Sequence, residues 1–562
     1  MSGSLSYLSG TSSKPLLGLT IGDMLDDSAT RFPDNDALIV IHQDIRFSYR
    51  KLRAAVDECA KAFLALGVQK GDRVGMWSPN RYEWTVIQFA TAKIGAILVN
   101  INPSYFVPEL EYALNQSGCQ TLVMADRFRN SNFTEMLYEL APELADNEKR
   151  FANAERVPHL HTIIRLAEDE KPGTLTWNAF LVGAARVSDD ELAERQKNLS
   201  ADEPINIQYT SGTTGFPKGA TLSHHNILNN GYFGAELMNF TENDRLVIPV
   251  PLYHCFGMVM GNLCCMTHGA AMIYASEGFE PAATLAAVQR ERATALYGVP
   301  TMFIAELDLP DFAEYDLTSL RTGIMAGSPC PIEVMKKVQS LMHIPEMQIG
   351  YGMTETSPIS TQTRIGTPLE KQVSTVGQIH PHVEIKIIDP ETGLTVPRGT
   401  PGEYCARGYN VMLGYWNNPE ATHNAIDAAR WMHSGDLATM DDEGYIRIVG
   451  RIKDMIIRGG ENVYPREIEE FLYAHPSISD VQVIGVPDAK YGEQVMAWIR
   501  IKEGDALTAD DVKAFCNGQL AHFKVPHYIR FTDTFPMTVT GKIRKVEMRE
   551  ISIRELGLDE LA

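Results

Sequence analysis

Apolar positions along the chain gather in short runs that are separated by longer segments of mixed character. Runs such as Asp72–Trp77 and Ala96–Asn100 are typical of buried strands, and the segment Glu83–Lys93 between them predicts a helix. The alternation resumes after residue 240, in the strand-like runs Arg245–Val250 and Ala270–Tyr274. Because strands that alternate with helices form parallel sheets, the pattern predicts an α/β fold with mainly parallel, helix-covered sheets.

The pattern changes towards the end of the chain. Residues 382–449 carry glycine and proline turns between alternating stretches, which indicates a small β subdomain. Pro465 then begins an amphipathic helix, and two strand-like runs follow it, as in a small α/β unit. A chain of 562 residues is too long for one core. We therefore predict a large N-terminal domain over residues 1–450 and a small C-terminal domain over residues 451–562.

One stretch is unusually rich in glycine and hydroxyl residues. It runs from Tyr209 to Ala220 and carries Lys218 near its end. Its glycines allow close approach of the backbone to a ligand, and its hydroxyls, backbone N–H groups and lysine predict a cradle for phosphate oxygens. A flexible linker is the alternative, although a linker needs neither proline nor lysine. The stretch is not a Walker A loop, because that motif needs a serine or threonine directly after the lysine, and here Gly219 follows Lys218. The residues that we expect to bind phosphate are Thr210, Ser211, Gly212, Thr213, Thr214, Gly215 and Lys218.

Further unusual residues follow the predicted strands of the second half. His254, Gly298, Gly327 and Gly350 each lie at or after the end of a strand-like run. Ligands of parallel sheets bind beyond the carboxyl ends of the strands. We therefore expect a binding site at this edge.

Composition narrows the function classes. The formal charge of −21 argues against nucleic acid as a partner, because a phosphate-binding surface would be basic. Eight cysteines without Cys-x-x-Cys spacing give no sign of a zinc site and fit small core residues in a reducing compartment. No apolar run is long enough to cross a bilayer, and no leader is visible at the start. We expect a cytoplasmic protein that can form a homodimer.

The glycine-rich stretch and five later segments together resemble the adenylate-forming superfamily, which includes acyl-CoA synthetases, luciferases and the adenylation domains of peptide synthetases. The resemblance covers most of the chain, with the segments in the family's order. The later segments are Pro251–Met258, Met347–Glu355, Trp431–Asp436, Gly450–Tyr464 and Pro536–Arg544. Ala295–Phe303 and His522–Pro526 look closest to the medium-chain branch known as acyl-CoA synthetase family member 2.

The resemblance implies roles for single residues around a nucleotide. Tyr351 next to Gly352 would lie against adenine, although a core tyrosine is the alternative. Thr354 would contact the α-phosphate, and Glu355 would help to hold Mg²⁺, which prefers carboxylate oxygens. Asp436 would bind the ribose hydroxyls; alone, its Ser-Gly-Asp segment is usually just a turn. The remaining nucleotide contacts implied by the family are Gly327, Ser328 and Arg451.

The resemblance also implies a domain rotation between two half-reactions. Lys542 would stabilise the charge in the first reaction, where an acid and MgATP give an acyl-adenylate. Rotation about Lys453 would then withdraw Lys542 and bring Arg458, Gly459 and Gly460 to the pantetheine arm of CoA. On its own, Lys542 would be interpreted as a solvated turn lysine.

The expected substrate is a fatty acid of medium length. The predicted acyl pocket is apolar and includes His254, Phe256, Gly298 and Val299. His254 is as well explained as a packed core histidine. Two alternatives to a CoA ligase stay open: an enzyme that loads an acyl group onto a carrier-protein thiol, and a non-catalytic nucleotide-binding protein.

Overall fold

The computed structural model describes residues 4–146, 154–210, 217–328, 330–459, 461–537 and 543–559. The chain forms two compact units. The larger one comprises Leu8–Ile385 and Ala406–Met432, and the smaller one comprises Met1–Tyr7, Lys386–Cys405 and His433–Ala562. The predicted domain boundary near residue 450 stays a prediction.

The first sheet of the larger unit is built around strands buried on both faces. It is parallel except at one edge, where the last strands pair antiparallel. Within the described residues its order is β10 (Leu175–Thr176), β9 (Thr162–Arg165), β6 (Thr121–Met124), β4 (Arg73–Trp77), β5 (Ile97–Ile101), β11 (Pro204–Thr210), β12 (Lys218–Ser223) and β22 (Gly414–Tyr415).

The second sheet of this unit is parallel at its centre and antiparallel at its two edges. Within the described residues its order is β19 (Gln378–Ile379), β18 (Ile359–Gln362), β17 (Glu346–Gly352), β16 (Thr322–Ala326), β15 (Ala295–Gly298), β13 (Arg245–Val247), β14 (Ala271–Tyr274), β2 (Asp36–Val40) and β3 (Ile45–Ser48).

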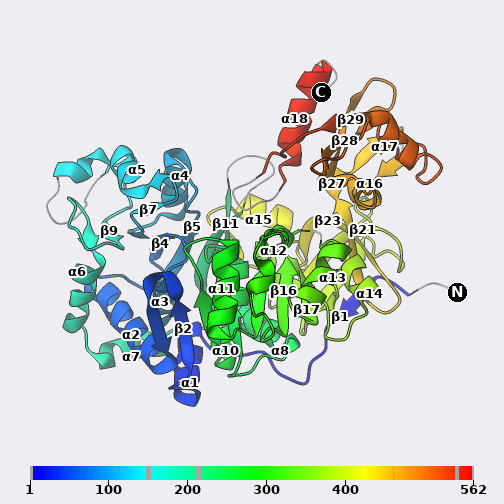
Figure 1. Cartoon of the computed structure of the whole chain (residues 1–562). Helices are drawn as coiled ribbons and strands as arrows, with labels where there is room; N and C mark the ends of the chain where they lie inside the picture. Colours follow the sequence, from blue (N-terminus) through cyan, green and yellow to red (C-terminus); the bar gives the residue numbers. More distant parts are fainter. Residues whose placement is uncertain are drawn as a thin grey trace. The chain divides into compact units, whose positions relative to one another are not determined.

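Helices cover both faces of both sheets. Helices α2 (Tyr49–Ala65), α3 (Tyr82–Ile94) and α8 (His224–Leu237) share one core with residues from the two sheets. Helices α4 (Val107–Ser117) and α5 (Phe133–Leu140) cover the other face of the first sheet. Helices α11 (Pro281–Glu291), α12 (Pro300–Leu307) and α13 (Ile332–Leu341) cover the other face of the second (Figure 1). The predicted fold class, mainly parallel sheets under helices, is confirmed.

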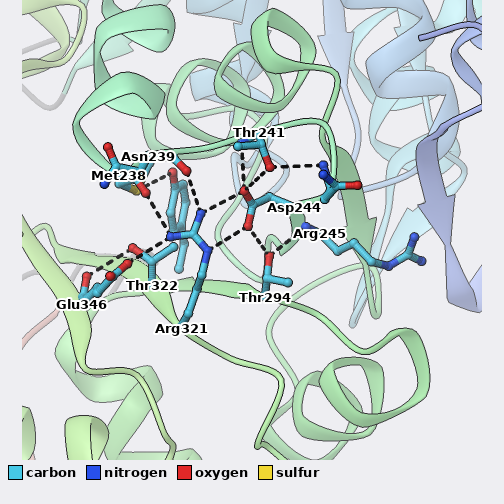
Figure 2. A network of polar contacts seen from close by, with 11 residues as sticks. Met238, Asn239, Thr241, Asp244, Arg245, Thr294, Arg321, Thr322 and Glu346 are labelled. Carbon is cyan, nitrogen blue, oxygen red and sulfur yellow. Dashed lines mark hydrogen bonds and ion pairs between the residues drawn. The ribbon is translucent and has the colours of Figure 1, made fainter.

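A partly buried ion pair holds the amino ends of the parallel strands of the second sheet (Figure 2). Arg321, just before β16, donates to both carboxylate oxygens of Asp244, at 2.8 and 3.1 Å. Thr294, just before β15, donates to Asp244 at 2.7 Å, and Arg321 also reaches Glu346 on β17 at 3.0 Å. This clamp of Asp244, Arg321, Thr294 and Glu346 ties together the amino ends of the strands. Ligands of parallel sheets bind at the opposite, carboxyl ends.

The smaller unit contains a sheet of the order β26 (Glu461–Val463), β25 (Ile456–Arg458), β28 (Gly492–Ile501) and β27 (Ile478–Asp488), with β29 (Tyr528–Phe531) beside β28. Its helices are α16 (Pro465–Tyr473), α17 (Ala509–Cys516) and α18 (Lys545–Leu556). A further sheet has the order β1 (Tyr7–Ser9), β20 (Val383–Ile388), β21 (Gly402–Gly408), β23 (Met432–Met440) and β24 (Ile446–Arg451). It matches the predicted β subdomain.

Two details differ from the sequence expectations. The strand predicted over Arg245–Val250 ends at Val247, because Pro249 has no N–H to continue a ladder. Residues 126–200 show little hydrophobic periodicity in the sequence, yet they form β9 and β10 of the first sheet and also helices α6 (Trp177–Val182) and α7 (Asp189–Lys197). Among the described helices, none is long and apolar enough to cross a membrane.

Candidate active site

The predicted phosphate loop connects two antiparallel strands of the first sheet. Thr210 ends β11 and faces Lys218, which begins β12. β5 pairs with one side of this hairpin and β22 with the other, so both ends of the loop are fixed by backbone hydrogen bonds. The five other predicted phosphate ligands lie outside the described residues: Ser211, Gly212, Thr213, Thr214 and Gly215.

Glu355 lies against the base of this loop. It belongs to a short 3₁₀ turn, η6 (Thr354–Thr356), that follows β17, and it is 5% exposed. Its Oε1 accepts a hydrogen bond from the Tyr415 hydroxyl at 2.8 Å and lies 3.4 Å from Thr210 Oγ1. Lys218 Nζ lies 5.1 Å from the centroid of the Tyr415 ring. The structure thus brings three predicted residues together: Thr210, Lys218 and Glu355.

Tyr415 is the residue that sequence reasoning missed here. It lies on β22, where the pairing sets it opposite Ala220 of β12. Burial, followed by the negative charge of Glu355, raises the pKa of the Tyr415 hydroxyl well above its usual range. The hydroxyl therefore stays protonated at neutral pH and acts as a donor to the carboxylate. The only available signal was the aromatic pair Tyr415–Trp416, which is not specific to a site.

The donor chemistry around Glu355 fits a hard divalent cation. The neutral Tyr415 hydroxyl orients the carboxylate without placing a positive charge on it, and oxygen is the ligand atom that Mg²⁺ prefers. Glu355 and Thr210 are the described residues that could hold Mg²⁺ together with substrate phosphates. When bound, the ion would supply positive charge to phosphate oxygens.

The predicted adenine residues follow two neighbouring strands of the second sheet. β16 and β17 pair in parallel with Ala326 opposite Gly350, so the two chain segments beyond them lie at the same edge. Gly327 has φ +90°, a left-handed conformation that favours glycine. A Cβ on Gly352 would lie 1.8 Å from the carbonyl oxygen of Pro358, so only glycine fits. The remaining residues of this group, Ser328, Tyr351 and Thr354, lie in these same segments.

The predicted acyl residues also gather near this edge. Gly298 ends β15, and the Phe256 ring stacks on that of its neighbour Tyr297 at 5.5 Å. A Cβ on Gly327 would lie 3.1 Å from Val299, so the acyl and adenine segments adjoin. The ring of His254 lies 4.2 Å from that of Tyr253, which leaves both interpretations of His254 open.

The predicted ribose and hinge residues belong to the smaller unit. Arg451 Nε donates to Asp436 Oδ1 at 3.0 Å, because β23 and β24 pair with these residues opposite each other. Lys453 lies in the short 3₁₀ turn η7 (Ile452–Asp454) after β24. Arg458 donates to Gln494 at 2.7 Å, and Gly459 has φ +61°.

Two predicted residues of this unit, Gly460 and Lys542, lie outside the described residues. The roles assigned to all of the site residues stay predictions.

Sequence comparison relates the whole chain to known proteins. A family described as AMP-binding enzyme matches residues 25–416, and its C-terminal domain matches residues 467–542. The Bacillus subtilis (strain 168) protein YngI, provisionally named an acyl-CoA synthetase, is 48% identical over 97% of this chain and 99% of its own. Medium-chain acyl-CoA ligase ACSF2, mitochondrial, of Danio rerio is 46% identical over 98% of this chain and 91% of its own.

Solved structures give the same picture. ATP-bound MatB from Rhodopseudomonas palustris superposes with a TM-score of 0.82 at 29% identity, and covers 96% of this chain and 100% of its own. The anthranilate CoA ligase AuaEII, in complex with anthranoyl-AMP, gives a TM-score of 0.83 at 26% identity, and covers 97% of this chain and 99% of its own.

Proposed function

Because this chain belongs to the AMP-binding enzyme family and is an acyl-CoA synthetase of the AMP-forming kind, we propose that it joins a medium-chain fatty acid to CoA through an acyl-adenylate. The observation that carries the proposal is the convergence of Thr210, Lys218 and Glu355 at the base of the loop. A cation, a hydroxyl and a buried carboxylate at one point suit a triphosphate with its metal ion.

In the first half-reaction, a carboxylate oxygen of the acid attacks the α-phosphorus of ATP. The new P–O bond gives the acyl-adenylate, and the bond to the β-phosphate oxygen breaks to release pyrophosphate. Both reactants are anions, so the enzyme must position them and offset their repulsion. We assign these tasks to Lys218 and Thr210 at the loop, to Thr354 at the α-phosphate, and to Lys542.

In the second half-reaction, the sulfur of CoA attacks the acyl carbonyl carbon. The C–O bond to the phosphate breaks, AMP leaves, and the thiol proton is lost to solvent. We propose that the smaller unit rotates about Lys453 between the steps. Arg458 and the Gly459–Gly460 pair would then face the pantetheine arm, and the glycines would leave it room.

The medium chain length follows from two supports. Relatives at 43% and 46% identity carry the name medium-chain acyl-CoA ligase. The predicted pocket residues Phe256 and Val299 are apolar, and Val299 adjoins the adenine segment, which suits an uncharged hydrocarbon chain. A homodimer and a cytoplasmic location stay predictions, and the vertebrate relatives are named mitochondrial.

The experiment is a pyrophosphate-release assay with ATP, Mg²⁺ and straight-chain acids from acetate to palmitate, with and without CoA. We expect turnover that peaks at medium chains and requires CoA. Glu355→Gln should abolish most of it, while Glu346→Gln, at the opposite edge of the sheet, should not. Release that CoA fails to stimulate would point to a carrier-protein acceptor. No release with any acid would refute the proposal and favour a non-catalytic nucleotide-binding protein.

A further inference from the structure

A second cluster of metal-ligating side chains lies in the smaller unit. Glu403 and Cys405 are two residues apart on β21, so their side chains share one face of the strand, and His433 lies on the adjacent strand β23. His433 Nδ1 is 2.9 Å from Glu403 Oε2 and 3.6 Å from Cys405 Sγ. One ligand atom from each of the three residues lies within 4.8 Å of the others.

We propose that Glu403, Cys405 and His433 form a binding site for a thiophilic divalent cation such as Zn²⁺. A thiolate, an imidazole nitrogen and a carboxylate oxygen are the donors that Zn²⁺ takes in proteins. With Zn–S near 2.3 Å and Zn–N near 2.0 Å, neighbouring donors of a tetrahedral site lie about 3.5 Å apart. The 3.6 Å between Cys405 Sγ and His433 Nδ1 meets this distance. The carboxylate needs to move away from the imidazole by only a few tenths of an ångström.

Burial and access also suit a three-ligand site with an open position. Cys405 is fully buried, and the side chain of Glu403 is 12% exposed, so both are held on a rigid strand. The side chain of His433 is 28% exposed and leaves a path for the ion and for water as the fourth ligand. On binding, the thiol proton of Cys405 goes to solvent as the S–metal bond forms, and the imidazole keeps its proton on Nε2.

This site is not visible in the sequence because its ligands are not close together along the chain. The three ligands come from two strands, with His433 28 residues after Cys405, and only the sheet brings them together. Cys-x-x-Cys spacing is the usual sequence signature of zinc, and the chain has none.

The site is linked to the turn that carries Asp436. Glu403 Oε1 accepts from Gly435 N at 3.1 Å, and Asp436 N donates to Ser434 Oγ at 3.1 Å. A cation on Glu403 competes with this support of the turn. Provided that this chain is the proposed acyl-CoA synthetase and Asp436 binds ribose as the family resemblance implies, occupancy raises the KM for ATP and leaves the maximal rate nearly unchanged.

The test is a Co²⁺ titration of the full chain, with Co²⁺ as a spectroscopic substitute for Zn²⁺. We expect one Co²⁺ per chain with a sulfur-to-cobalt charge-transfer band, and displacement of that band by Zn²⁺. The variant Cys405→Ser should lose the band and bind more than about 100-fold more weakly, because even outer-shell losses cost about 10–100-fold. Cys516→Ser, a buried cysteine of α17 in the same unit, is the matched control and should keep the band.

Two results would overturn the proposal: no band in the wild-type protein, or a band that persists in Cys405→Ser. If Cys405→Ser does not fold by circular dichroism, His433→Gln takes its place, and it should change the band and weaken binding. The titration needs neither ATP nor acid. Loss of the metal site is therefore distinguishable from failure of the proposed acyl-CoA synthetase activity.

Discussion

The contact between Tyr415 and Glu355 gives the sharpest test of the candidate site. In Tyr415→Phe the ring stays and the hydroxyl that donates to Glu355 Oε1 at 2.8 Å is lost. A hydrogen bond to a charged group contributes about 1.5–3 kcal/mol net. Thr210 Oγ1, at 3.4 Å, is too distant to replace it. At about 1.4 kcal/mol per factor of ten, kcat/KM for adenylation should fall about 10- to 100-fold.

The assay separates the two half-reactions. Pyrophosphate release at varied Mg²⁺ measures adenylation, and thioester formation from supplied acyl-adenylate and CoA measures the second step. Because Glu355 is proposed to hold Mg²⁺ only with the triphosphate, the variant should need more Mg²⁺ for half-maximal release. Its thioester step should change by less than about twofold.

Tyr138→Phe is the matched control. It also removes a tyrosine hydroxyl that donates at 2.9 Å, in this case to the carbonyl of Pro172, remote in sequence from every predicted site residue. It should leave both half-reactions unchanged. The reasoning is refuted if Tyr415→Phe adenylates at the wild-type rate, or if it slows both half-reactions equally.

Four further predictions follow from the proposal and from the buried charges. Lys542→Ala should slow adenylation by about 100- to 1,000-fold and spare thioester formation from supplied acyl-adenylate in rapid-quench assays; equal losses would contradict the rotation. Lys453→Pro, which fixes φ, should leave a pyrophosphate burst but block thioester formation, and an intact CoA-dependent rate would remove the hinge.

Asp244→Asn should lower the free energy of unfolding by about 1–3 kcal/mol in urea melts. Burial opposes ionisation of Asp244, but hydrogen bonds from Arg321, Thr294 and Thr241 hold the pKa of Asp244 below 3.8. The loss of stability should therefore be full above pH 3.8 and should vanish as the pH falls further. A difference between variant and wild type that stays constant with pH would contradict this. Glu306 is fully buried with no hydrogen-bond partner for its carboxyl oxygens among the described residues, and burial raises its pKa well above 4.5. Glu306→Gln should therefore stabilise the protein, by up to about 1.4 kcal/mol more per pH unit above 4.5, and melts with a pH-independent gain would contradict this.

Much of the fold follows from local pattern. The helix predicted over Glu83–Lys93 lies within α3 (Tyr82–Ile94), and the strand predicted over Asp72–Trp77 is β4 (Arg73–Trp77). Gly298 and Gly327 lie at the carboxyl ends of adjacent parallel strands, as expected, while binding of a ligand there stays a prediction. The spacing of apolar residues and the positions of glycines set these features, and both can be seen in a single sequence.

Contacts between segments that are far apart in the sequence cannot be predicted from local pattern. The clamp of Asp244, Arg321 and Glu346 uses residues that look like ordinary surface charges in the sequence. Likewise Glu403 and His433 meet only because β21 and β23 are neighbours. In each case the partner is chosen by strand order, and strand order depends on long-range packing that hydrophobic period does not encode.

Register decides the chemistry at Glu355 in the same manner. Tyr415 follows Glu355 by 60 residues and reaches it because β22 pairs with β12. A slip of one residue would turn Tyr415 to the other face of the sheet. The choice of tyrosine also matters, because a lysine or arginine donor would neutralise the carboxylate and weaken it as a ligand for a cation. A protonated phenol orients Glu355 and leaves its charge intact. The structure therefore supports a carboxylate that is both held in place and able to bind a cation.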